Sequence, residues 1–367
     1  MGHSSTLAFT GGGTGGHIYP GLAVIEALRA RGHEGRIIWL GSRRESDRDI
    51  VERASVEYFA LPAGKLRRSL SPRNVADGFR VIAGYLASRK VLASTRPALL
   101  FSKGGYVSVP PCAAAAALGI PYLTHESDLS PGLATRLNAG RARLILTAYD
   151  RTRDLLAPQF RTKCRTVGNP IRDTMRRGDA ALGRSLLGLP QGLPLLLFLG
   201  GSQGARQINE LVEAVLGDLT KRCFVVHQTG PGGSRLPHTG VNYRAFEYIR
   251  DELPHFLAAA HLVVGRAGAG TLWECGAAGK PMVLVPLAGA GTRGDQVDNA
   301  ALFEERGAAI SLAGDRATPE NLLSAIFGFL DDPAGHRAAS LAAGELAGAD
   351  AAGDTADLIL NLLGELR

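Results

Sequence analysis

The sequence predicts an α/β protein built from parallel sheets with helices on both faces. Short apolar runs alternate with helical patterns along the whole chain, and two of these runs lead into glycine-rich turns that open a helix. A length of 367 residues suits two domains better than one core, and an apolar fraction of 45% supplies both. The four cysteines lack metal-ligand spacing, which is typical of a reducing compartment.

The apolar runs define the expected strands. In the first half they are residues 7–10, 36–40, 98–102, 120–124 and 143–147. In the second half they are residues 194–200, 222–227, 261–265, 282–286 and 308–312. Proline and glycine at 168–170 and 189–194 indicate a connector. We therefore expect domains over residues 1–170 and 171–349, with a final helix at about 350–367 that packs back on the first domain.

The first glycine turn, residues 11–16, lies between the run 7–10 and a helical pattern. A strand, a glycine turn and a helix N-terminus in this order favour an anion, because backbone amides and the helix dipole point at the ligand. His17 adds a side chain that can exchange a proton near neutral pH. The pattern predicts a phosphate site with a titratable group at its edge.

A dinucleotide site is an alternative, since Gly11, Gly13 and Gly16 satisfy that fingerprint. The fingerprint also expects an acid at the end of the next strand. Arg43 and Arg44 stand there instead, which would suit a 2′-phosphate and leaves an NADP enzyme open. A turn that only seats a helix on the sheet is a third interpretation.

The second half opens in the same way, with an apolar run at 195–199 before the turn 200–205. A third glycine turn, 265–270, follows the run 262–264. Glu274, one turn into the next helix, suits a pair of ribose hydroxyls because a carboxylate accepts two hydrogen bonds at once. It would equally stabilise the start of that helix.

The net charge of +7 is concentrated in residues 65–96, and this segment argues for a local anionic partner rather than a nucleic acid. The segment holds one acid, Asp77, and eight bases: Lys65, Arg67, Arg68, Arg73, Arg80, Arg89, Lys90 and Arg96. We expect its helix to bury a stripe of Val75, Phe79, Ile82 and Leu86, with Val81, Tyr85 and Leu92 widening the apolar surface. Basic and apolar residues side by side suit an anionic lipid surface.

The sequence predicts neither a membrane-spanning segment nor a metal site. No run approaches the length that spans a bilayer, and the chain shows no leader pattern at its start. The acidic pair around Arg48, Asp47 and Asp49, lies in a charged run. We interpret that run as a solvated face and not as a metal site.

Five blocks occur in an order that resembles the family of peptidoglycan glycosyltransferases that add N-acetylglucosamine to lipid I. They are residues 12–20, 103–110, 125–136, 200–205, and 265–274 followed by 296–300. The resemblance implies the GT-B architecture, two Rossmann-like domains facing across a cleft. It implies UDP-N-acetylglucosamine as donor, lipid I as acceptor, and inversion to the β-1,4-linked product lipid II. A place on the cytoplasmic face of the bacterial membrane follows from the acceptor.

The resemblance also assigns residues. The donor contacts would be Arg172, Ser202, Gln203, Ile249, Ala269, Gly270, Thr271, Leu272, Glu274, Gln296 and Asn299. The acceptor contacts would be Gly13, Thr14, Gly15, Gly16, Lys103, Gly104 and Tyr106. His17 is the first candidate for the general base and Asp128 the second. Ser127 and Asp128 depart from the commoner family spelling of Gln and Asn, which leaves the assignment of the base open.

The expected cofactor requirement is none, although a divalent cation could assist the pyrophosphates. Expected partners are UDP-N-acetylglucosamine, lipid I and an anionic inner-membrane surface that contacts residues 65–96, with room for other cell-wall synthesis proteins and no nucleic acid. The alternatives are a GT-B enzyme with another donor or acceptor, a sugar-nucleotide 2-epimerase, and a non-catalytic nucleotide-binding module or NADP enzyme.

Overall fold

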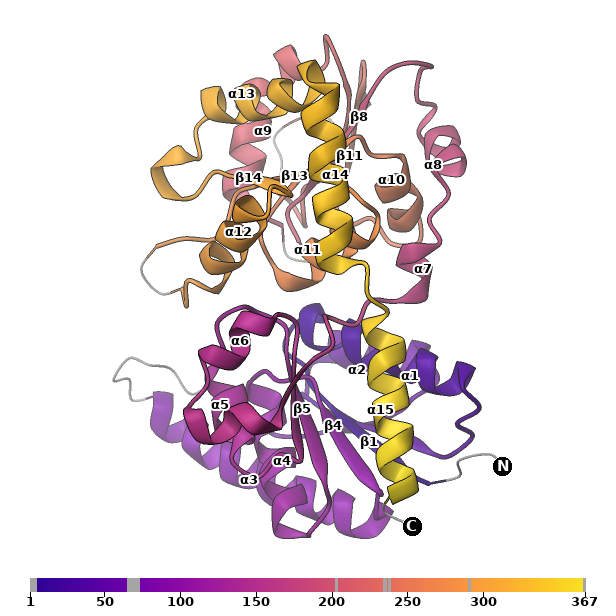
Figure 1. Cartoon of the computed structure of the whole chain (residues 1–367), viewed down its shortest axis with the longest axis vertical. Helices are drawn as coiled ribbons and strands as arrows, with labels where there is room; N and C mark the ends of the chain where they lie inside the picture. The colour runs from indigo at the N-terminus through magenta and orange to yellow at the C-terminus, as the bar shows by residue number, and fades with distance from the viewer. Residues whose placement is uncertain are drawn as a thin grey trace. The chain divides into compact units, whose positions relative to one another are not determined.

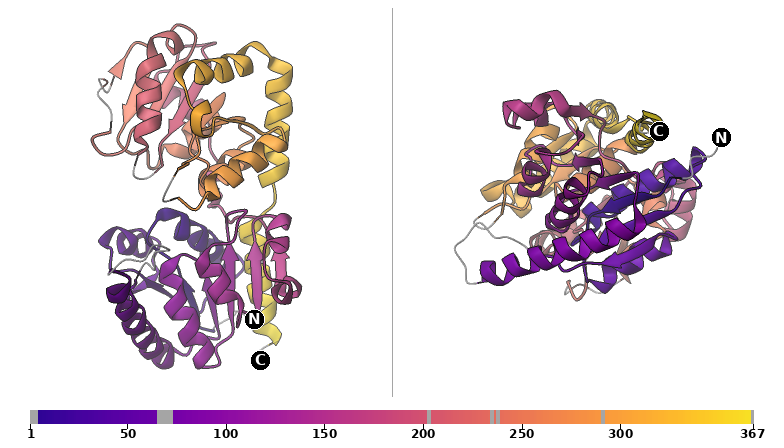
Figure 2. Two further views of the ribbon diagram at one scale, coloured as in Figure 1. Left: turned by 90° about the vertical axis from the view of Figure 1, so that its left-hand side faces the viewer. Right: turned by 90° about the horizontal axis from the view of Figure 1, so that it is seen from below.

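The computed structural model describes residues 5–64, 73–201, 204–233, 236, 239–289 and 292–365. The chain forms two compact units. The first combines Met1–Arg172 with Asp350–Arg367, and the second is Asp173–Ala349. Parallel strands with helices on both faces of each sheet confirm the predicted α/β class (Figures 1 and 2).

The first unit alternates strands and helices along the chain. Its strands are β1 (Leu7–Thr10), β2 (Ile37–Gly41), β3 (Glu57–Ala60), β4 (Leu99–Ser102), β5 (Tyr122–Glu126), β6 (Leu144–Thr147) and β7 (Cys164–Thr166). Its helices are η1 (Gly15–His17), α1 (Tyr19–Ala30), α2 (Glu45–Arg53), α3 (Arg73–Thr95), η2 (Tyr106–Ser108), α4 (Val109–Ala117), α5 (Leu133–Ala139), α6 (Asp150–Asp154), η3 (Pro158–Lys163) and α15 (Ala351–Glu365).

The strands of the first sheet are all parallel, in the order β3-β2-β1-β4-β5-β6-β7. Because side chains alternate along a strand, Leu7 and Phe9 of β1 enter one core and Ala8 enters the other. Helices α1 and α15 cover the Phe9 side, where Ile359 is fully buried, and they lie side by side in Figure 1. The order reverses between β1 and β4, so the loops after these two strands meet at one edge.

The second unit repeats this plan. Its strands are β8 (Leu195–Leu199), β9 (Phe224–Gln228), β10 (Thr239–Gly240), β11 (Tyr243–Phe246), β12 (Leu262–Gly265), β13 (Met282–Leu284) and β14 (Ala309–Ser311). Its helices are α7 (Asp173–Arg176), α8 (Ala180–Leu187), α9 (Arg206–Leu219), α10 (Leu253–Ala259), α11 (Ala269–Ala277), α12 (Asp295–Glu305), η4 (Gly314–Arg316), α13 (Pro319–Asp331) and α14 (Pro333–Ala347). The order is β10-β11-β9-β8-β12-β13-β14, and only the short β10 runs antiparallel among these described strands. The switch point lies between β8 and β12.

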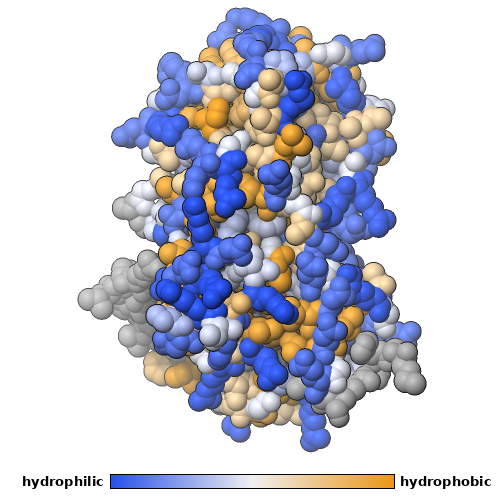
Figure 3. All heavy atoms as spheres, in the orientation of Figure 1, coloured by the Kyte–Doolittle hydropathy of each residue, from blue (hydrophilic) through white to orange (hydrophobic). Residues whose placement is uncertain are grey.

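The predicted buried stripe of α3 is wrong. Phe79 is 70% exposed, and Ile82 and Leu86 are each 58% exposed. Small residues face inward instead: Gly84 approaches the backbone of the preceding segment so closely that a Cβ would lie 2.3 Å from the Pro62 carbonyl oxygen. The helix can lie this close only through its small side, which turns the large apolar residues to the surface. Apolar atoms reach the surface at the edge of this unit where α3 lies (Figure 3).

The other apolar residues predicted to widen the apolar surface of α3 differ in burial. Leu92 is buried, whereas Val81 and Tyr85 are half-buried. Residues 65–72 and the side chain of Val75 lie outside the described part, so the basic residues of that stretch are not placed. Among the described residues no helix is both long and apolar enough to cross a bilayer.

Candidate active site

The first glycine turn follows β1 at the switch point of the first sheet. Gly13 has φ +85°, and a Cβ there would lie 2.8 Å from a ring carbon of Tyr106, which follows β4. Glycine is required by both the backbone and the ring. Trp39 donates its indole N–H to the Gly11 carbonyl over 3.1 Å, which ties the turn to β2. Thr14 and Gly16 are exposed, so the tip of the turn is open to solvent.

Asp47, in helix α2, binds this turn, and its predicted place on a solvated face is wrong. Its side chain is buried and accepts hydrogen bonds from Gly13 N over 2.6 Å and from Ser42 Oγ over 2.7 Å. Arg44 donates to the Gly13 carbonyl oxygen over 2.7 Å. A carboxylate of this chain therefore holds the Gly13 amide. A pyrophosphate can reach that amide only if Asp47 is displaced. The acceptor contacts predicted for Thr14, Gly15 and Gly16 remain predictions.

His17 lies where the two loops of the switch point meet. It is half-buried, and a Cβ at Gly105 would lie 2.8 Å from its Cδ2 atom. Gly105 has φ +73°, so the β4 loop presents bare backbone to the imidazole. The candidate base is thus held against the carboxyl edge of the sheet, beside both predicted acceptor loops.

Lys103, a predicted acceptor contact, is buried. It is 1% exposed, and its Nζ donates to His125 Nδ1 over 3.0 Å and to Ser127 Oγ. Burial lowers the pKa of Lys103 to about 8, against the charges of Glu126 and Asp128. The neighbouring Gly104 has φ +80° and packs against the backbone of β5. Lys103 was predicted to contact the acceptor, but its side chain is buried in this structure.

Asp128 lies in a loop that Glu126 organises. Glu126 is buried and accepts from Asp128 N over 3.2 Å and from Gly132 N over 2.8 Å. It also accepts from Thr135 Oγ1 over 2.6 Å. Asp128 itself is half-buried. The second candidate base therefore has a fixed backbone and a partly accessible carboxylate.

Arg172 closes the first stretch of this unit. Its guanidinium lies over the ring of Tyr19, with 4.4 Å from Cζ to the ring centroid. Such a contact orients a cation without neutralising its charge. The predicted phosphate contact at Arg172 remains a prediction.

In the second unit, Gln228 organises the loop after β8. Its Nε2 donates to the Gly201 carbonyl over 3.0 Å and its Oε1 accepts from Ile249 N over 3.0 Å. Ser202 and Gln203, predicted donor contacts, lie outside the described residues. Ile249 is 1% exposed, so its side chain is part of the core in this structure and its predicted uracil contact stays untested.

The loop after β12 leads into α11, whose first turn supplies the predicted diphosphate amides of Ala269, Gly270 and Thr271. Leu272 is fully buried and its N–H donates to the Gly268 carbonyl over 3.1 Å, so it supports the helix rather than presenting a group at the edge. Glu274 is half-buried. Its predicted ribose contact stays a prediction.

Helix α12 carries the two amides predicted to contact the sugar. Gln296 accepts from Leu287 N over 2.9 Å and is half-buried. Asn299 is fully buried and donates to the Ala267 carbonyl over 3.2 Å. Arg266 donates to Gln207 and to the Val285 carbonyl, each over 2.8 Å, and burial lowers its pKa. The bonds of Asn299 and Arg266 fix the loop between β12 and α11, whereas the bond of Gln296 holds the loop after β13.

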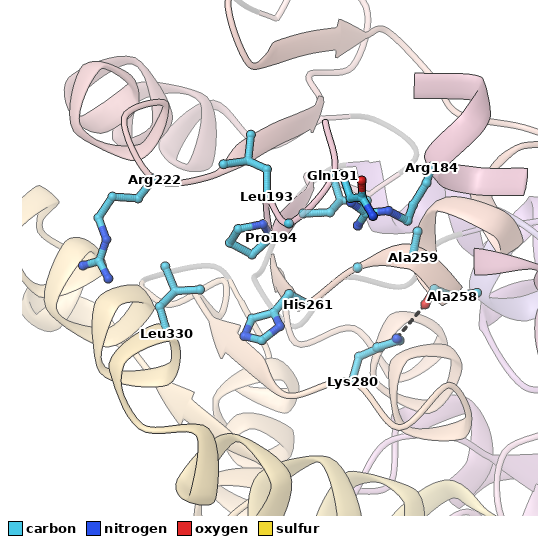
Figure 4. A pocket seen from close by; sticks show the side chains of 13 residues that line it. Arg184, Gln191, Leu193, Pro194, Arg222, Ala258, Ala259, His261, Lys280 and Leu330 are labelled. Carbon is cyan, nitrogen blue, oxygen red and sulfur yellow. Dashed lines mark hydrogen bonds between the residues drawn. The ribbon is translucent and has the colours of Figure 1, made fainter. Parts of the chain in front are cut away.

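A cavity of about 750 Å³ lies elsewhere in the second unit, at the edge where β8 begins. Figure 4 shows its basic side chains around Leu193, Pro194 and His261. Lys280 donates to the Ala258 carbonyl over 2.7 Å, Arg184 donates to the Pro190 carbonyl, and Arg222 pairs with Asp331. These cations serve the chain's own acceptors, so the cavity is not a candidate for the nucleotide site.

Sequence reasoning missed Asp47, Gln228 and the buried state of Lys103. Asp47 and Gln228 act through backbone groups of other loops, and nothing in their own neighbourhood signals that. The sequence held one signal for the Lys103 cluster. Lys103 stands between a strand and two glycines, and Ser127 follows the strand residue His125 by two positions.

Two Rossmann-like units, each with a glycine turn at its switch point, define a GT-B glycosyltransferase architecture. The chain belongs to glycosyltransferase family 28: the N-terminal domain of that family matches residues 7–147 and the C-terminal domain matches residues 195–352.

Curated relatives are similar over most of their length. A protein of Treponema denticola is 46% identical over 86% of this chain and 85% of its own, and one of Staphylococcus carnosus is 39% identical over 87% and 88%. One of Lachnoclostridium phytofermentans is 36% identical over 98% and 99%. All three are named UDP-N-acetylglucosamine–N-acetylmuramyl-(pentapeptide) pyrophosphoryl-undecaprenol N-acetylglucosamine transferase.

Solved structures share the fold at lower identity. MurG of Acinetobacter baumannii superposes with a TM-score of 0.71 at 22% identity, covering 98% of this chain and 99% of that one. The calicheamicin glycosyltransferase CalG4 gives 0.70 at 17% identity, covering 98% of both. A UDP-N-acetylglucosamine 2-epimerase gives 0.68 at 14%, covering 100% of this chain and 98% of that one. Transferases and epimerases therefore share this architecture, and the fold alone does not choose between them.

Proposed function

We propose that this chain transfers N-acetylglucosamine from UDP-N-acetylglucosamine to the C4 hydroxyl of N-acetylmuramic acid in lipid I, giving lipid II for peptidoglycan synthesis. The observation that carries the proposal is the identity of 36–46% to transferases named for this reaction, over at least 85% of their length. The glycine turns at both switch points supply anion-binding backbone of the kind that two pyrophosphate-bearing substrates need.

The reaction is a single inverting displacement. The acceptor oxygen forms a bond to the anomeric carbon from one face as the bond between that carbon and the phosphate oxygen breaks. UDP leaves with the electron pair, and the hydroxyl proton passes to a base on the protein. Amides at the start of α11 and the Arg172 guanidinium would stabilise the charge on UDP.

The base is His17, with Asp128 as the second candidate. The contact of His17 with Gly105 supports the first choice, because it holds the imidazole beside both acceptor loops. General-base catalysis typically contributes ~10²–10⁴-fold to a rate. His17→Asn should lower kcat by that range. If kcat stays within a few-fold of the parent, the imidazole is not the base, and Asp128→Asn should then show the loss.

No metal cofactor is required in this proposal, because amides and guanidinium groups can carry the charge on the leaving group. A divalent ion could still assist either pyrophosphate. Transfer measured with a chelator in excess over all divalent ions should keep most of its rate. Abolition by the chelator, with recovery on adding Mg²⁺, would contradict this part of the proposal.

The exposed side of α3 is the proposed contact with the membrane that contains lipid I. Phe79, Ile82 and Leu86 are exposed there, and Arg89 and Lys90 are exposed on the same helix. Apolar side chains that enter the interface, with cations beside anionic headgroups, favour peripheral binding. Because UDP-sugars are cytoplasmic metabolites, the proposed location is the cytoplasmic face of the cell membrane.

A 2-epimerase is the alternative that needs a direct test. With UDP-N-acetylglucosamine alone, an epimerase would form the manno isomer of the donor. The proposed transferase would leave the sugar unchanged until a lipid I analogue is added, and would then release one UDP per lipid II formed. Isomer formation without acceptor would overturn the proposal.

A further inference from the structure

We propose that Lys103 is a positioning residue: its buried ammonium binds His125 and Ser127, and with the carboxylate of Asp128 it fixes the loop that carries this candidate base. Its effect on catalysis rests on the proposed transferase function, whereas its ionisation does not. The assignment replaces the acceptor contact expected for Lys103 with a role beneath the acceptor loops.

The proton positions in this cluster follow from the acceptors. His125 Nε2 lies 2.8 Å from the Gly168 carbonyl oxygen, which can only accept, so the imidazole carries its proton on Nε2. Nδ1 is then an acceptor, and Lys103 Nζ donates to it over 3.0 Å. Burial and the nearby ammonium hold the pKa of His125 well below its usual range, so the ring stays neutral. The donor and the acceptor of each hydrogen bond from Lys103 through His125 to Gly168 are therefore defined.

The cluster joins three segments at one point. Lys103 begins the loop after β4, His125 is in β5, and Gly168 begins the stretch that leads out of the first unit. The β4 and β5 strands are parallel neighbours, so their loops emerge at the same edge. Removing the ammonium leaves a buried imidazole nitrogen and a hydroxyl without their donor. A positioning effect on all three segments is the expected consequence.

Charge explains why Asp128 accompanies this lysine. A charged lysine that is 1% exposed is costly unless opposite charges lie near, and Glu126 and Asp128 both stabilise its ammonium. Glu126 is occupied by its bonds to Asp128 N, Gly132 N and Thr135 Oγ1. Asp128 is the partner whose carboxylate is half-buried and near the surface.

Size explains Ser127 in the same way. Its hydroxyl contacts Lys103 Nζ in a buried position, so a longer side chain at 127 would have to displace the ammonium. Ser127 and Asp128 thus supply a short hydroxyl and a negative charge to a buried lysine. We infer that the three residues form one coupled unit.

The first experiment measures ionisation without using activity. The sequence has six lysines, so the Cε signal of Lys103 in a carbon-13 spectrum can be assigned by its loss in Lys103→Met. Its pKa should be near 8, and lower still in Asp128→Asn, because one of the two stabilising carboxylates is removed. Lys163, which donates to the Gly140 carbonyl at the surface, is the internal comparison and should not respond. A Lys103 pKa of 10 or above, or no response to Asp128→Asn, would overturn the proposal.

The second experiment measures transfer to a lipid I analogue against pH at saturating donor. In the parent, kcat should fall as pH rises through about 8, where Lys103 loses its proton. In Asp128→Asn this alkaline fall should begin at lower pH, and in Lys103→Met it should be absent, with kcat at pH 7 reduced about 10–100-fold. The double variant should lose less than the product of the two single losses.

Controls separate positioning from contact and from unfolding. UDP affinity should stay within two-fold of the parent in every variant, which shows that the donor side is intact, and Lys163→Met should behave as the parent. A rise in acceptor KM alone for Lys103→Met, with the alkaline fall retained, would make Lys103 an acceptor contact and refute positioning. If the parent shows no transfer at all, the proposed function fails, while the ionisation experiment still decides the coupling.

Discussion

The exposed apolar side chains of α3 allow a quantitative prediction for membrane binding. Fully burying a side chain of this size contributes roughly 1.5–3 kcal/mol. Phe79 is 70% exposed and Ile82 and Leu86 are each 58% exposed, so inserting the exposed parts contributes about 5 kcal/mol in total. Replacing all three by alanine should remove about 4 kcal/mol of this, which is on the order of a 10³-fold loss in partitioning.

The assay is co-sedimentation with vesicles that contain an anionic phospholipid, compared with neutral vesicles at low and high salt. Arg89 and Lys90 should add about 1 kcal/mol each near an anionic surface, and salt should weaken this part. Transfer to a water-soluble acceptor analogue should be unchanged in the triple variant, because α3 is not part of the predicted substrate loops.

Leu341→Ala is the matched control, since Leu341 is 70% exposed on α14 in the second unit. It should bind vesicles as the parent does. Parent-like binding by the triple alanine variant would refute the reasoning about α3. An equal loss in Leu341→Ala would show that general exposed hydrophobicity, and not this face, drives binding.

Three further predictions concern single buried side chains. Asp47→Asn should lower the free energy of unfolding by about 1–3 kcal/mol in urea titrations, because the Gly13 amide and the Ser42 hydroxyl lose a charged acceptor, while Asp49→Asn should be near neutral; equal effects would contradict this. Burial lowers the pKa of His227 to about 4, so the unfolded state takes up its proton first as pH falls below 6.5, and stability drops. His227→Gln should lose less stability between pH 6.5 and 4, by at most about 1.4 kcal/mol per pH unit. Gln228→Ala should weaken UDP binding about tenfold in calorimetry through release of the loop at Gly201, and unchanged affinity would show that this bond does not order the site.

The strands that sequence reasoning found are the central ones of both sheets, together with β14 at one edge. A strand that is buried on both faces reads as a continuous apolar run, and β1, β4, β8 and β12 all lie inside predicted runs. The missed strands β3, β7, β10 and β11 lie at or near sheet edges. Strands β3, β7 and β11 each combine a charged residue with apolar ones, and β10 is only two residues long, so no apolar run marks them.

Helix α3 shows why the direction of a helix face was not predictable. The hydrophobic pattern places Phe79, Ile82 and Leu86 on one stripe, and the usual inference buries such a stripe. The structure buries Gly84 and Ser88 instead, because close approach of the helix to its neighbours needs small side chains. Periodicity identifies the stripe, but only tertiary contacts decide whether it meets core, solvent or another surface.

The candidate site was predictable where backbone conformation carries the chemistry. The glycine turns follow from the residue type, since positive φ at positions such as Gly13 and Gly105 favours glycine. Side chains that act at a distance along the chain were not predictable. Asp47 reaches the Gly13 amide across 34 residues, and no local pattern encodes this pair. Lys103 reaches Ser127 across 24 residues, and the glycines after it gave only an indirect signal.

The first unit is assembled from both ends of the chain, and this has a consequence for its folding during translation. Ile359 and Leu363 of α15 are buried in the same core as Phe9 and Trp39, yet they are translated after the entire second unit. At about 5–20 residues per second, the sheet of the first unit waits roughly 10–35 s for the helix that completes it. During that interval the contiguous second unit can fold, while the first presents an uncovered apolar groove beside α1. A nascent chain arrested before α15 should therefore recruit chaperones through its first unit.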